Sequence, residues 1–400
     1  MVGIVETSKP IATRWNAVFL LVATGVVAAL QVGKVAIAAP VMQEDLGIGL
    51  AAIGWLTGIF AVLGLIGGIF TGAFTASFGS RRVLVLGLLT IAAGAAMGAL
   101  ATTLPILLLS RVIEGAGFLM ITVAAPSILG HVTERAHRDL AFGLWSCFMP
   151  VGMTLAMLTG PLFEGWRAMW WASSATTLGV CLAVMFAIPA TGERLAWSWR
   201  SLLANTLAVV RTGGLVVLAI VFALYSLVFF ALFSFLPVLL MERMEVTHKT
   251  AGLLSAFATI SNILGNLAAG YLLSNGIRRA SLLAGTGLVM GVTGLGIFLP
   301  VLPNTTAFVL CVVFSAVGGL IPATLLASAP LAAPTASLTP VVLGLIVQGN
   351  NLGQIVGPIA IGSAIERFGW ESASILVACA TLFTAGVAMR LRRMSWNSSE

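Results

Sequence analysis

The longest stretch of this chain without an acidic or basic side chain runs from Ala280 through Ile365. One crossing of a lipid bilayer takes roughly 20 consecutive apolar residues, so this stretch alone holds three crossings and their turns. Only 8% of the 400 residues are charged, whereas a soluble domain carries about 25%. So few charged groups cannot cover a water-facing globule of this size. We therefore expect an all-α membrane protein.

Hydropathy divides the chain into twelve apolar segments, each long enough for one transmembrane helix. Their expected bounds are 15–40, 50–76, 83–102, 105–129, 141–163, 168–189, 214–240, 250–273, 280–299, 305–329, 340–364 and 372–389. With the N-terminus in the cytoplasm, fourteen of the 20 lysines and arginines fall in cytoplasmic segments and four in external loops. This positive-inside bias predicts a multi-pass protein of a bacterial plasma (inner) membrane, with both termini in the cytoplasm.

The net charge of +7 follows from that loop bias and does not indicate a nucleic-acid partner. All four cysteines fall inside apolar segments without paired spacing, so we expect neither a disulfide nor a metal site. The sequence contains no phosphate-cradling Gly-x-x-x-x-Gly-Lys-Ser/Thr motif, no nucleophile motif and no metal-binding box. We therefore expect no enzyme, no cofactor and no metal, and a protein driven by an ion gradient or by the solute's own gradient.

Three sequence landmarks of the first half return in the second half, in the same order and at nearly the same spacing. They are the glycine-rich turns that begin at Gly72 and Gly270, the pairs Gly160-Pro161 and Gly357-Pro358, and the pairs Gly165-Trp166 and Gly369-Trp370. Such a repeat predicts two homologous six-helix bundles with the same orientation in the membrane. The expected domains are residues 1–189, a cytoplasmic linker over 190–213, and residues 214–400.

These landmarks resemble those of a known family, the major facilitator superfamily. Its pattern Gly-x-x-x-Asp-x-x-Gly-x-Arg-Arg/Lys after the second helix is matched at Gly72, Gly79, Arg81 and Arg82, and its fourth-helix pattern at Arg111, Gly115 and Gly117. The pair Gly160-Pro161 partly matches the fifth-helix pattern of drug:proton antiporters. The chain is similar to the superfamily along essentially its whole length. This resemblance implies a secondary transporter that works by alternating access between two bundles.

The chain also departs from the family patterns. Ala76 stands where the turn pattern has aspartate, and Glu114 stands where glutamine is commoner. In the family that aspartate caps a neighbouring helix and joins a latch of the outward-facing state, so the resemblance implies a weaker or differently built latch here. Ala156 and Glu164 occupy positions where the antiporter pattern has glycines, so only half of that pattern is present.

Three charged residues fall inside the expected spans, and all lie in the first half: Lys34, Arg111 and Glu114. A charge at the centre of a membrane helix costs about 2.5–3.5 kcal/mol on insertion scales. Gln31 and Lys34 are three residues apart and share a helix face, which favours a common substrate site, with Lys34 as the positive pole for an anion or as a titrating group. The structural alternative is a lysine that reaches the external headgroups.

Arg111 and Glu114 share a helix face by the same spacing. As a structural pair they neutralise each other and brace the bundle. As a functional pair, Glu114 carries the coupling proton and Arg111 tunes it, and the family resemblance favours a relay or gating role for Arg111. A third hypothesis adds Lys34, which pairs with Glu114 in an empty cavity until an anion displaces the carboxylate.

The expected spans of the second half contain amides instead of charges. An amide supplies two donors and an acceptor without the cost of a buried charge, which suits recognition of a polar solute. The candidate substrate-binding residues there are Asn262, Asn266, Asn350, Gln354 and, on an aromatic wall, Tyr225. Their structural alternative is interhelical hydrogen bonding, worth about 0.6 kcal/mol on average.

Two series of glycines recur every four residues, at Gly64, Gly68 and Gly72 and at Gly349, Gly353 and Gly357. Each series presents a flat stripe to which another helix can approach closely and along which it can slide. We expect these stripes to serve packing and bundle movement and not to bind a ligand.

Two hypotheses for the transported solute follow. A cationic half that faces an amide half favours proton symport of a small organic or inorganic anion. The alternative is a proton-antiport exporter of drugs or metabolites, favoured by Gly160-Pro161 and by very apolar cavity walls. The expected partners are the solute, protons and the lipid bilayer, and the protein is expected to be monomeric. A channel or a receptor fits less well, because the chain contains its own pair of bundles and has short tails.

Overall fold

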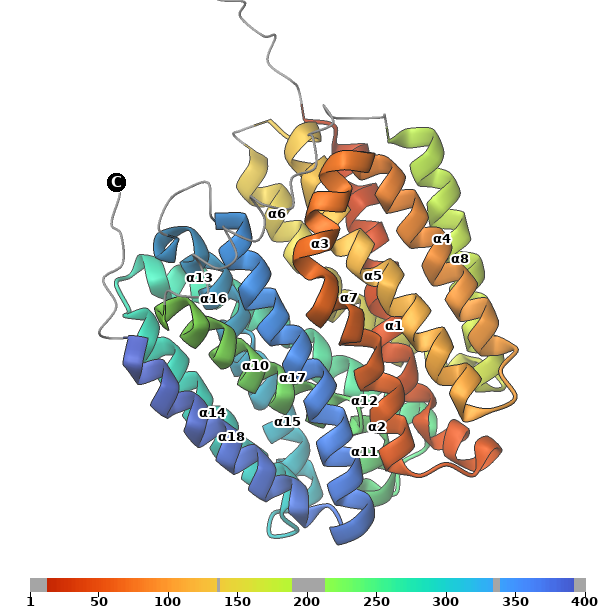
Figure 1. Ribbon diagram of the computed structural model, residues 1–400. Helices are drawn as coiled ribbons and strands as arrows, with labels where there is room; N and C mark the ends of the chain where they lie inside the picture. Colours follow the sequence, from red (N-terminus) through yellow and green to blue (C-terminus); the bar gives the residue numbers. More distant parts are fainter. Residues whose placement is uncertain (1–12, 135–136, 189–212, 334–338, 392–400) are drawn as a thin grey trace, which may run out of the picture.

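The computed structural model describes residues 13–134, 137–188, 213–333 and 339–391. These residues form α-helices linked by turns and short 3₁₀ segments, and none of them forms a strand (Figure 1). The linker expected over 190–213 lies outside the described residues apart from its last one. The boundaries of the expected domains therefore stay a prediction.

The first half of the chain forms six long segments, of which the second and the fifth are interrupted. In chain order the elements are α1 (Trp15–Leu46), α2 (Leu50–Gly58), η1 (Ile59–Ala61), α3 (Val62–Phe78), α4 (Ser80–Ala99), α5 (Leu104–Val132), α6 (Arg138–Ser146), α7 (Phe148–Thr159), η3 (Gly160–Leu162) and α8 (Trp166–Ala187). Helix α1 continues past Pro40 and ends at Gly47, whose φ of 63° and backbone hydrogen bond to Gln43 terminate the helix.

The second half also forms six long segments, and its first, second and fourth are interrupted. The elements are α10 (Gly213–Phe233), α11 (Leu236–Met244), α12 (His248–Ile260), α13 (Asn262–Ser274), α14 (Arg279–Phe298), α15 (Asn304–Gly318), α16 (Leu320–Ala332), α17 (Thr339–Phe368) and α18 (Glu371–Arg390). Turn glycines with positive φ precede α4 and α14, at Gly79 (91°) and Gly276 (83°), so both copies of the repeated turn contain a glycine in a conformation that favours this residue.

Eleven helical segments of the described residues are long and apolar enough to cross a membrane. The remaining long segment, α17, has 30 residues and lies alongside the others (Figure 1). Its four amides, Gln348, Asn350, Asn351 and Gln354, reduce its apolar character. The expected all-α membrane fold is therefore confirmed.

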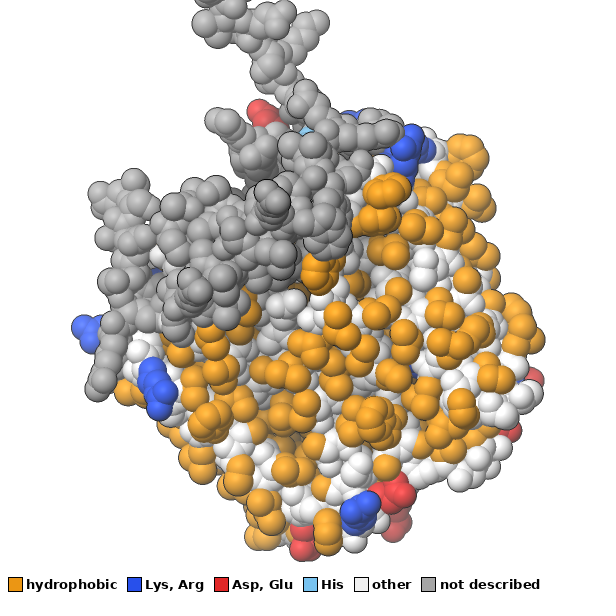
Figure 2. Space-filling model, viewed as in Figure 1, with side chains coloured by type: hydrophobic (Ala, Val, Ile, Leu, Met, Phe, Trp, Pro, Cys, Tyr) orange, Lys and Arg blue, Asp and Glu red, His pale blue; other side chains and the backbone are white. Residues whose placement is uncertain are grey.

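We name the two ends of the bundle by its helices. The terminal face is the end where α1 begins at Trp15 and α18 ends at Arg390, and the distal face is the end where α1 stops at Leu46 and α2 begins at Leu50. On the face that Figure 2 shows, the surface between the two ends is mostly hydrophobic, and the charged side chains of the described residues gather near the ends. This distribution suits a protein whose middle lies in hydrocarbon.

The apolar core shows where the two halves of the chain join. One buried cluster, which includes Leu21, Leu84, Ile128 and Val184, belongs to the first half alone and lies toward the terminal face. A second cluster combines distal parts of the first half, such as Ile53, with the second half. The halves therefore share a continuous core only toward the distal face.

Helix contacts between the halves follow the same division. Helix α2 packs along the distal part of α17, the start of α3 packs on the middle of α17 where Gly64 meets Asn351, α7 packs on α12, and α1 contacts α11. Among the described residues, α6 and α13, which lie toward the terminal face, make no comparable contact. The two bundles are thus closed against each other at the distal face and separated toward the terminal face, as Figure 1 shows for the ribbons.

Candidate functional site

The three charged residues of the first half form one buried network. The Lys34 ammonium on α1 donates to Glu114 Oε1 on α5 at 2.7 Å, and the Arg111 guanidinium pairs with Glu114 Oε2. Arg111 Nε also donates to the carbonyl of Leu56 at 3.1 Å. All three charged side chains are 0% exposed. The network therefore links α1, α2 and α5, and Lys34 points into the bundle and not toward the distal surface.

Two glycines, one on α4 and one on α5, leave room for this network. A Cβ at Gly94 of α4 would lie 2.8 Å from Glu114 Cγ, and a Cβ at Gly115 would overlap the carbonyl oxygen of Phe60. Larger side chains at either position would push the helices apart. Gly115 matches a glycine of the fourth-helix pattern, and its contact with η1 explains in physical terms why that position needs glycine.

Aromatic rings cover both cations. The Lys34 ammonium lies 4.4 Å from the ring centroid of Trp170 on α8, and the Arg111 guanidinium lies 4.5 Å from that of Phe60. Cation–π contacts of desolvated groups contribute about 2 kcal/mol or more. Neither ring could be identified from the sequence, because an aromatic residue in an apolar span carries no signal that separates a cation partner from a packing residue.

Gln31 lies next to the network but binds a different helix. Its Oε1 accepts a hydrogen bond from Ser173 of α8 at 2.8 Å, and its Nε2 donates to the carbonyl of Val27 at 3.1 Å. Gln31 is 0% exposed. In this conformation both ends of its amide are occupied within the first half, so Gln31 supports the α1–α8 contact beside Lys34.

The charges of the network do not balance. Two cations share one carboxylate, so the fully ionised network carries one net positive charge. Arg111 Nη2 is buried and has no hydrogen-bond partner among the described residues. A buried ion without full compensation is unfavourable by several kcal/mol, so gain or loss of one proton changes the energy of this network strongly. A network of this kind is suited to proton coupling.

The amides of α13 lie where two helices are interrupted. Asn262 Nδ2 donates to the carbonyl of Ser315 at 2.9 Å and to the Tyr225 hydroxyl at 3.4 Å, and its own Oδ1 accepts from Asn266 at 2.9 Å. Asn262 begins α13 directly after the break that follows α12, and a Cβ at Gly319, in the break between α15 and α16, would overlap the Asn262 carbonyl. Asn262 therefore joins three segments of the second half.

The amides of α17 differ in how well they are satisfied. Asn350 Oδ1 accepts from Ser226 of α10 at 2.5 Å. Gln354 is 1% exposed, and its Nε2 has no partner among the described residues. Asn351 lies against the other half, since a Cβ at Gly64 of α3 would come within 2.6 Å of its Nδ2. Gln354 thus retains unused hydrogen-bonding capacity, while Asn350 and Asn351 contact neighbouring helices.

The residues of the family patterns occupy structural positions. Gly79 adopts a φ of 91° between α3 and α4, a conformation that favours glycine. Arg81 donates to the backbone carbonyl of Met185 near the end of α8, and Arg82 is exposed. The surroundings of Gly72 and the side chain of Ala76 lie outside the described part of the chain. At the distal end, Gly160 and Pro161 form η3, and a Cβ at Gly160 would come within 2.6 Å of Ile37.

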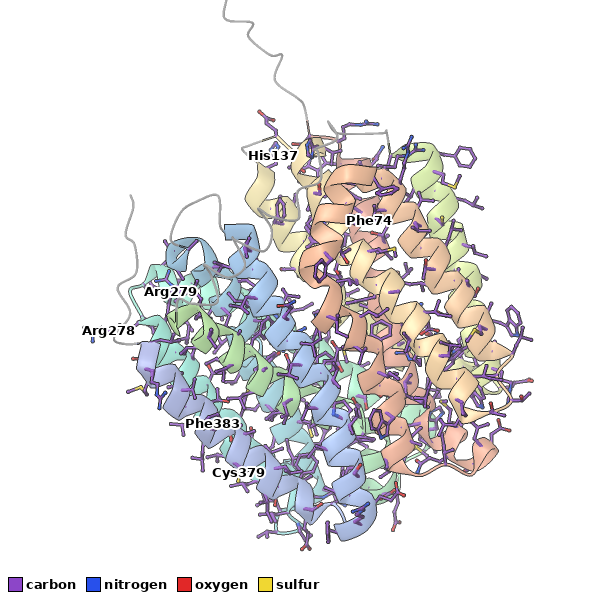
Figure 3. The ribbon with its side chains drawn as sticks, viewed as in Figure 1. Phe74, His137, Arg278, Arg279, Cys379 and Phe383 are labelled. Atoms are coloured by element: carbon purple, nitrogen blue, oxygen red, sulfur yellow. The ribbon has the colours of Figure 1, made fainter. Side chains whose placement is uncertain are left out.

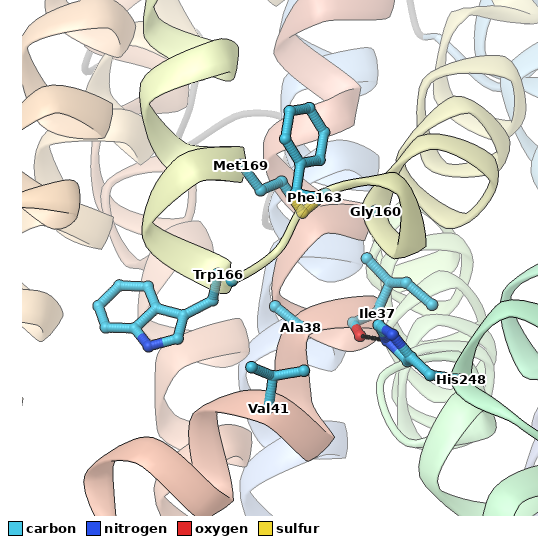
Figure 4. Close-up of a pocket in the computed structure, with 9 residues that line it drawn as sticks. Ile37, Ala38, Val41, Gly160, Phe163, Trp166, Met169 and His248 are labelled. Carbon is cyan, nitrogen blue, oxygen red and sulfur yellow. Dashed lines mark hydrogen bonds between the residues drawn. The ribbon is translucent and has the colours of Figure 1, made fainter.

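A small cavity of about 10 Å³ lies beside η3 at the distal face (Figure 4). Its volume corresponds to about one water molecule. The lining residues are Ile37, Ala38, Val41, Gly160, Phe163, Gly165, Trp166, Met169 and His248. His248 of α12 also hydrogen-bonds through Nε2 to the carbonyl of Ile37 at 2.6 Å. This contact joins the two halves at the distal face.

A larger groove of about 480 Å³ lies on the outside of the bundle among α10, α17 and α18. Its lining residues are Leu224, Leu227, Val356, Ala360, Ile361, Leu376, Cys379, Ala380 and Phe383. The side chains of Cys379 and Phe383 point away from the bundle (Figure 3). An apolar groove at this position suits contact with lipid.

Two relatives of this chain match different shares of its length. The chain is 29% identical to a chloramphenicol resistance protein of Streptomyces lividans over 359 residues, which is 86% of this chain and 88% of that protein. It is 23% identical to a galactose–proton symporter of Escherichia coli (strain K12) over 154 residues, which is 38% of this chain and 33% of that protein.

A solved structure has the same fold. It is a crystal structure of a bacterial homologue of the human lysosomal transporter Spinster in an inward-facing and occupied conformation, with a TM-score of 0.80 and 18% sequence identity. The match covers 98% of this chain and all of that chain. The family model described as Major Facilitator Superfamily matches residues 21–346. The chain therefore belongs to the Major Facilitator Superfamily and is a secondary transporter of the multi-pass membrane type.

Proposed function

We propose that this protein exports small, largely neutral organic molecules across a bacterial plasma membrane in exchange for protons. A chloramphenicol resistance protein matches 86% of the chain, whereas a galactose–proton symporter matches 38%. The relatives therefore favour the exporter over anion symport. In the proposed orientation the terminal face is cytoplasmic, in agreement with the distribution of cations along the sequence.

The observation that carries this proposal is the closed network of Lys34, Arg111 and Glu114. The Lys34 ammonium is bound to Glu114 at 2.7 Å and fully buried, so an anion that used Lys34 as its positive pole would first have to displace the Glu114 carboxylate. Lys34 and Arg111 both bind Glu114 inside the first half. This arrangement favours a proton-coupling role for the network and leaves substrate recognition to other residues.

The coupled step follows from the charges. A proton that binds the Glu114 carboxylate gives a neutral acid, and Lys34 and Arg111 then lose their common counter-ion. The two cations repel each other at short range in a low-dielectric surrounding, which loosens the α1–α5 contact. Release of the proton restores the pair. Protonation state and packing of the first half are thereby linked, as alternating access requires.

Substrate recognition falls to the second half in this proposal. Gln354 has an unpartnered buried amide nitrogen, and a series of aromatic contacts runs along α10 through Phe222, Tyr225, Phe229 and Phe233. An amide donor on α17 and aromatic rings on α10, the helix that packs on α17, suit a neutral aromatic compound with carbonyl or hydroxyl groups, such as chloramphenicol. No charged group is needed for such a ligand.

Anion–proton symport is the competing proposal, because the fully ionised network carries one net positive charge. The two proposals differ in the solute and in the direction of coupling. Purified protein in proteoliposomes with an imposed pH gradient separates them. Labelled chloramphenicol should accumulate in the acidic compartment for an antiporter, whereas a labelled organic anion such as lactate should enter with the protons for a symporter. Accumulation of the anion alone would overturn the exporter.

A further inference from the structure

Trp170 is the largest of the fully buried side chains among the described residues, and it lies beside the coupling network. It belongs to α8, on the side of α1 away from the second half. Its ring lies 4.4 Å from the Lys34 ammonium. Helix α4 accommodates the ring by means of Gly98, where a Cβ would come within 2.6 Å of Trp170 Cδ1. The site is therefore built for a ring of this size at this position.

The indole nitrogen of Trp170 indicates that the ring is there for more than packing. Trp170 Nε1 is buried and has no hydrogen-bond partner among the described residues. A buried donor without a partner costs about 1–3 kcal/mol. Phenylalanine or leucine would fill apolar space without that cost. Tryptophan, however, has the ring that binds a cation most strongly, and its ring faces Lys34.

The same ring separates Lys34 from the distal surface. Trp166, one turn closer to the distal face on α8, contacts Trp170 edge-on at 5.4 Å between centroids. Trp166 Nε1 in turn donates to Asp45 at 2.8 Å, and Arg167 lies 4.3 Å from the Trp166 ring. The path from the exposed Asp45–Arg167 pair to Lys34 is thus filled by two indole rings. The cavity of about 10 Å³ is lined by Trp166 and so lies on the distal side of Trp170.

We infer that Trp170 is a positioning residue, which holds the Lys34 ammonium against Glu114 and keeps water of the distal face away from it. The groups that face Lys34 are Glu114 and Arg111 from α5 and the ring of Trp170 from α8. On α1, the polar residue nearest to Lys34 in the sequence is Gln31. Trp170 is therefore the contact from α8 that fixes the ammonium, and it does so through its ring face. This inference rests on the proposed proton coupling for its effect on transport.

The first experiment uses transport by reconstituted protein as a function of pH. Trp170→Leu should displace the midpoint of the pH profile by about 1.5 units, the roughly thirtyfold change in proton affinity that loss of a desolvated cation–π contact predicts. Trp170→Phe, which keeps a ring face, should restore most of the wild-type profile. Trp171→Leu is the matched control, because Trp171 is 46% exposed on the outside of the same helix. Identical profiles for Trp170→Leu and Trp171→Leu would overturn the inference.

A second experiment does not depend on transport. Folded protein in detergent is treated with acetic anhydride, and acetylation of each lysine is measured by mass spectrometry, with the exposed Lys249 as internal reference. Lys34 should be protected in the wild type and in Trp171→Leu and at least tenfold more reactive in Trp170→Leu, while the melting temperature verifies that each variant is folded. Equal protection of Lys34 in Trp170→Leu would refute the role of the ring. A wild type without pH-dependent transport would refute the proposed function alone.

Discussion

Glu366 near the distal end of α17 accepts a hydrogen bond from the backbone amide of Ala51, at the start of α2, at 2.8 Å. Gly49, the N-cap residue of α2, provides no side-chain cap, so the carboxylate from the other half takes this role. The negative charge also interacts favourably with the positive end of the α2 dipole. With the His248–Ile37 contact, this bond holds the distal face closed.

Glu366→Ala should therefore favour opening of the distal face. Loss of one charge-assisted hydrogen bond, about 1.5 kcal/mol, predicts a roughly tenfold larger population of the open state. The measurement is the labelling rate of Ile53→Cys, a buried position of α2, by a membrane-impermeant maleimide in a background without the four native cysteines. Glu164→Ala, which removes an exposed carboxylate of the same face, should leave the rate unchanged. Equal rates for both variants would show that Glu366 is not a latch.

The unbalanced charges of the network predict that removal of the Lys34 ammonium destabilises the protein much less than removal of the Glu114 charge. Lys34→Met leaves the balanced pair of Arg111 and Glu114 and should change the stability by about 1 kcal/mol or less. Glu114→Gln leaves two buried cations side by side and should destabilise by about 3–5 kcal/mol.

Thermal unfolding in detergent measures this order. The double variant Lys34→Met with Glu114→Gln should melt at a higher temperature than Glu114→Gln alone, because it removes one of the two unpaired cations. A double variant that melts below Glu114→Gln would contradict the unbalanced-charge explanation.

Glu114→Gln should also separate substrate binding from proton coupling. An amide cannot carry the proton, so accumulation driven by a pH gradient should fall to the background level. Exchange of internal unlabelled for external labelled chloramphenicol without a gradient needs no net proton movement and should persist. Counterflow in proteoliposomes checks both expectations, with a buffer pH at which the protein remains folded. Loss of exchange together with accumulation would place Glu114 in the substrate site instead.

The close packing of α17 on α10 predicts that methyl groups are not tolerated along one glycine series. A Cβ at Gly353 would overlap the carbonyl oxygen of Ala223. Gly353→Ala should therefore destabilise the protein by about 1–3 kcal/mol through overpacking. Gly386→Ala in α18, where a Cβ meets nothing within 4 Å, is the control and should be neutral or slightly stabilising. Similar melting temperatures would indicate that α17 shifts at little cost.

The fold could be predicted because its causes are local. Charge-free runs determine the spans by short-range chemistry, and both glycines of the repeated turn, Gly79 and Gly276, adopt a positive φ. The Arg111–Glu114 pair was also accessible, since helical spacing alone brings the two residues together.

The remaining contacts of the network depend on which helices become neighbours. Lys34 and Glu114 are 80 residues apart in the chain, and no pattern in either span identifies the other as its partner. Trp170 and Ser173 gave no signal, because they resemble ordinary residues of an apolar helix. The glycine series of α17 was correctly expected to allow close approach, but Gly353 faces α10 of the same half, whereas Gly64 faces Asn351 across the interface.

The exchange of one proton at Glu114 for a neutral molecule has an electrical consequence. In the proposed cycle the network carries one positive charge on the leg that exports substrate and two on the leg that returns with a proton. Export of a neutral molecule then moves net charge inward in every turnover. A membrane potential of 100 mV contributes about 2.3 kcal/mol for each charge that crosses, so a cell with a polarised membrane can drive export even when the pH on both sides is equal.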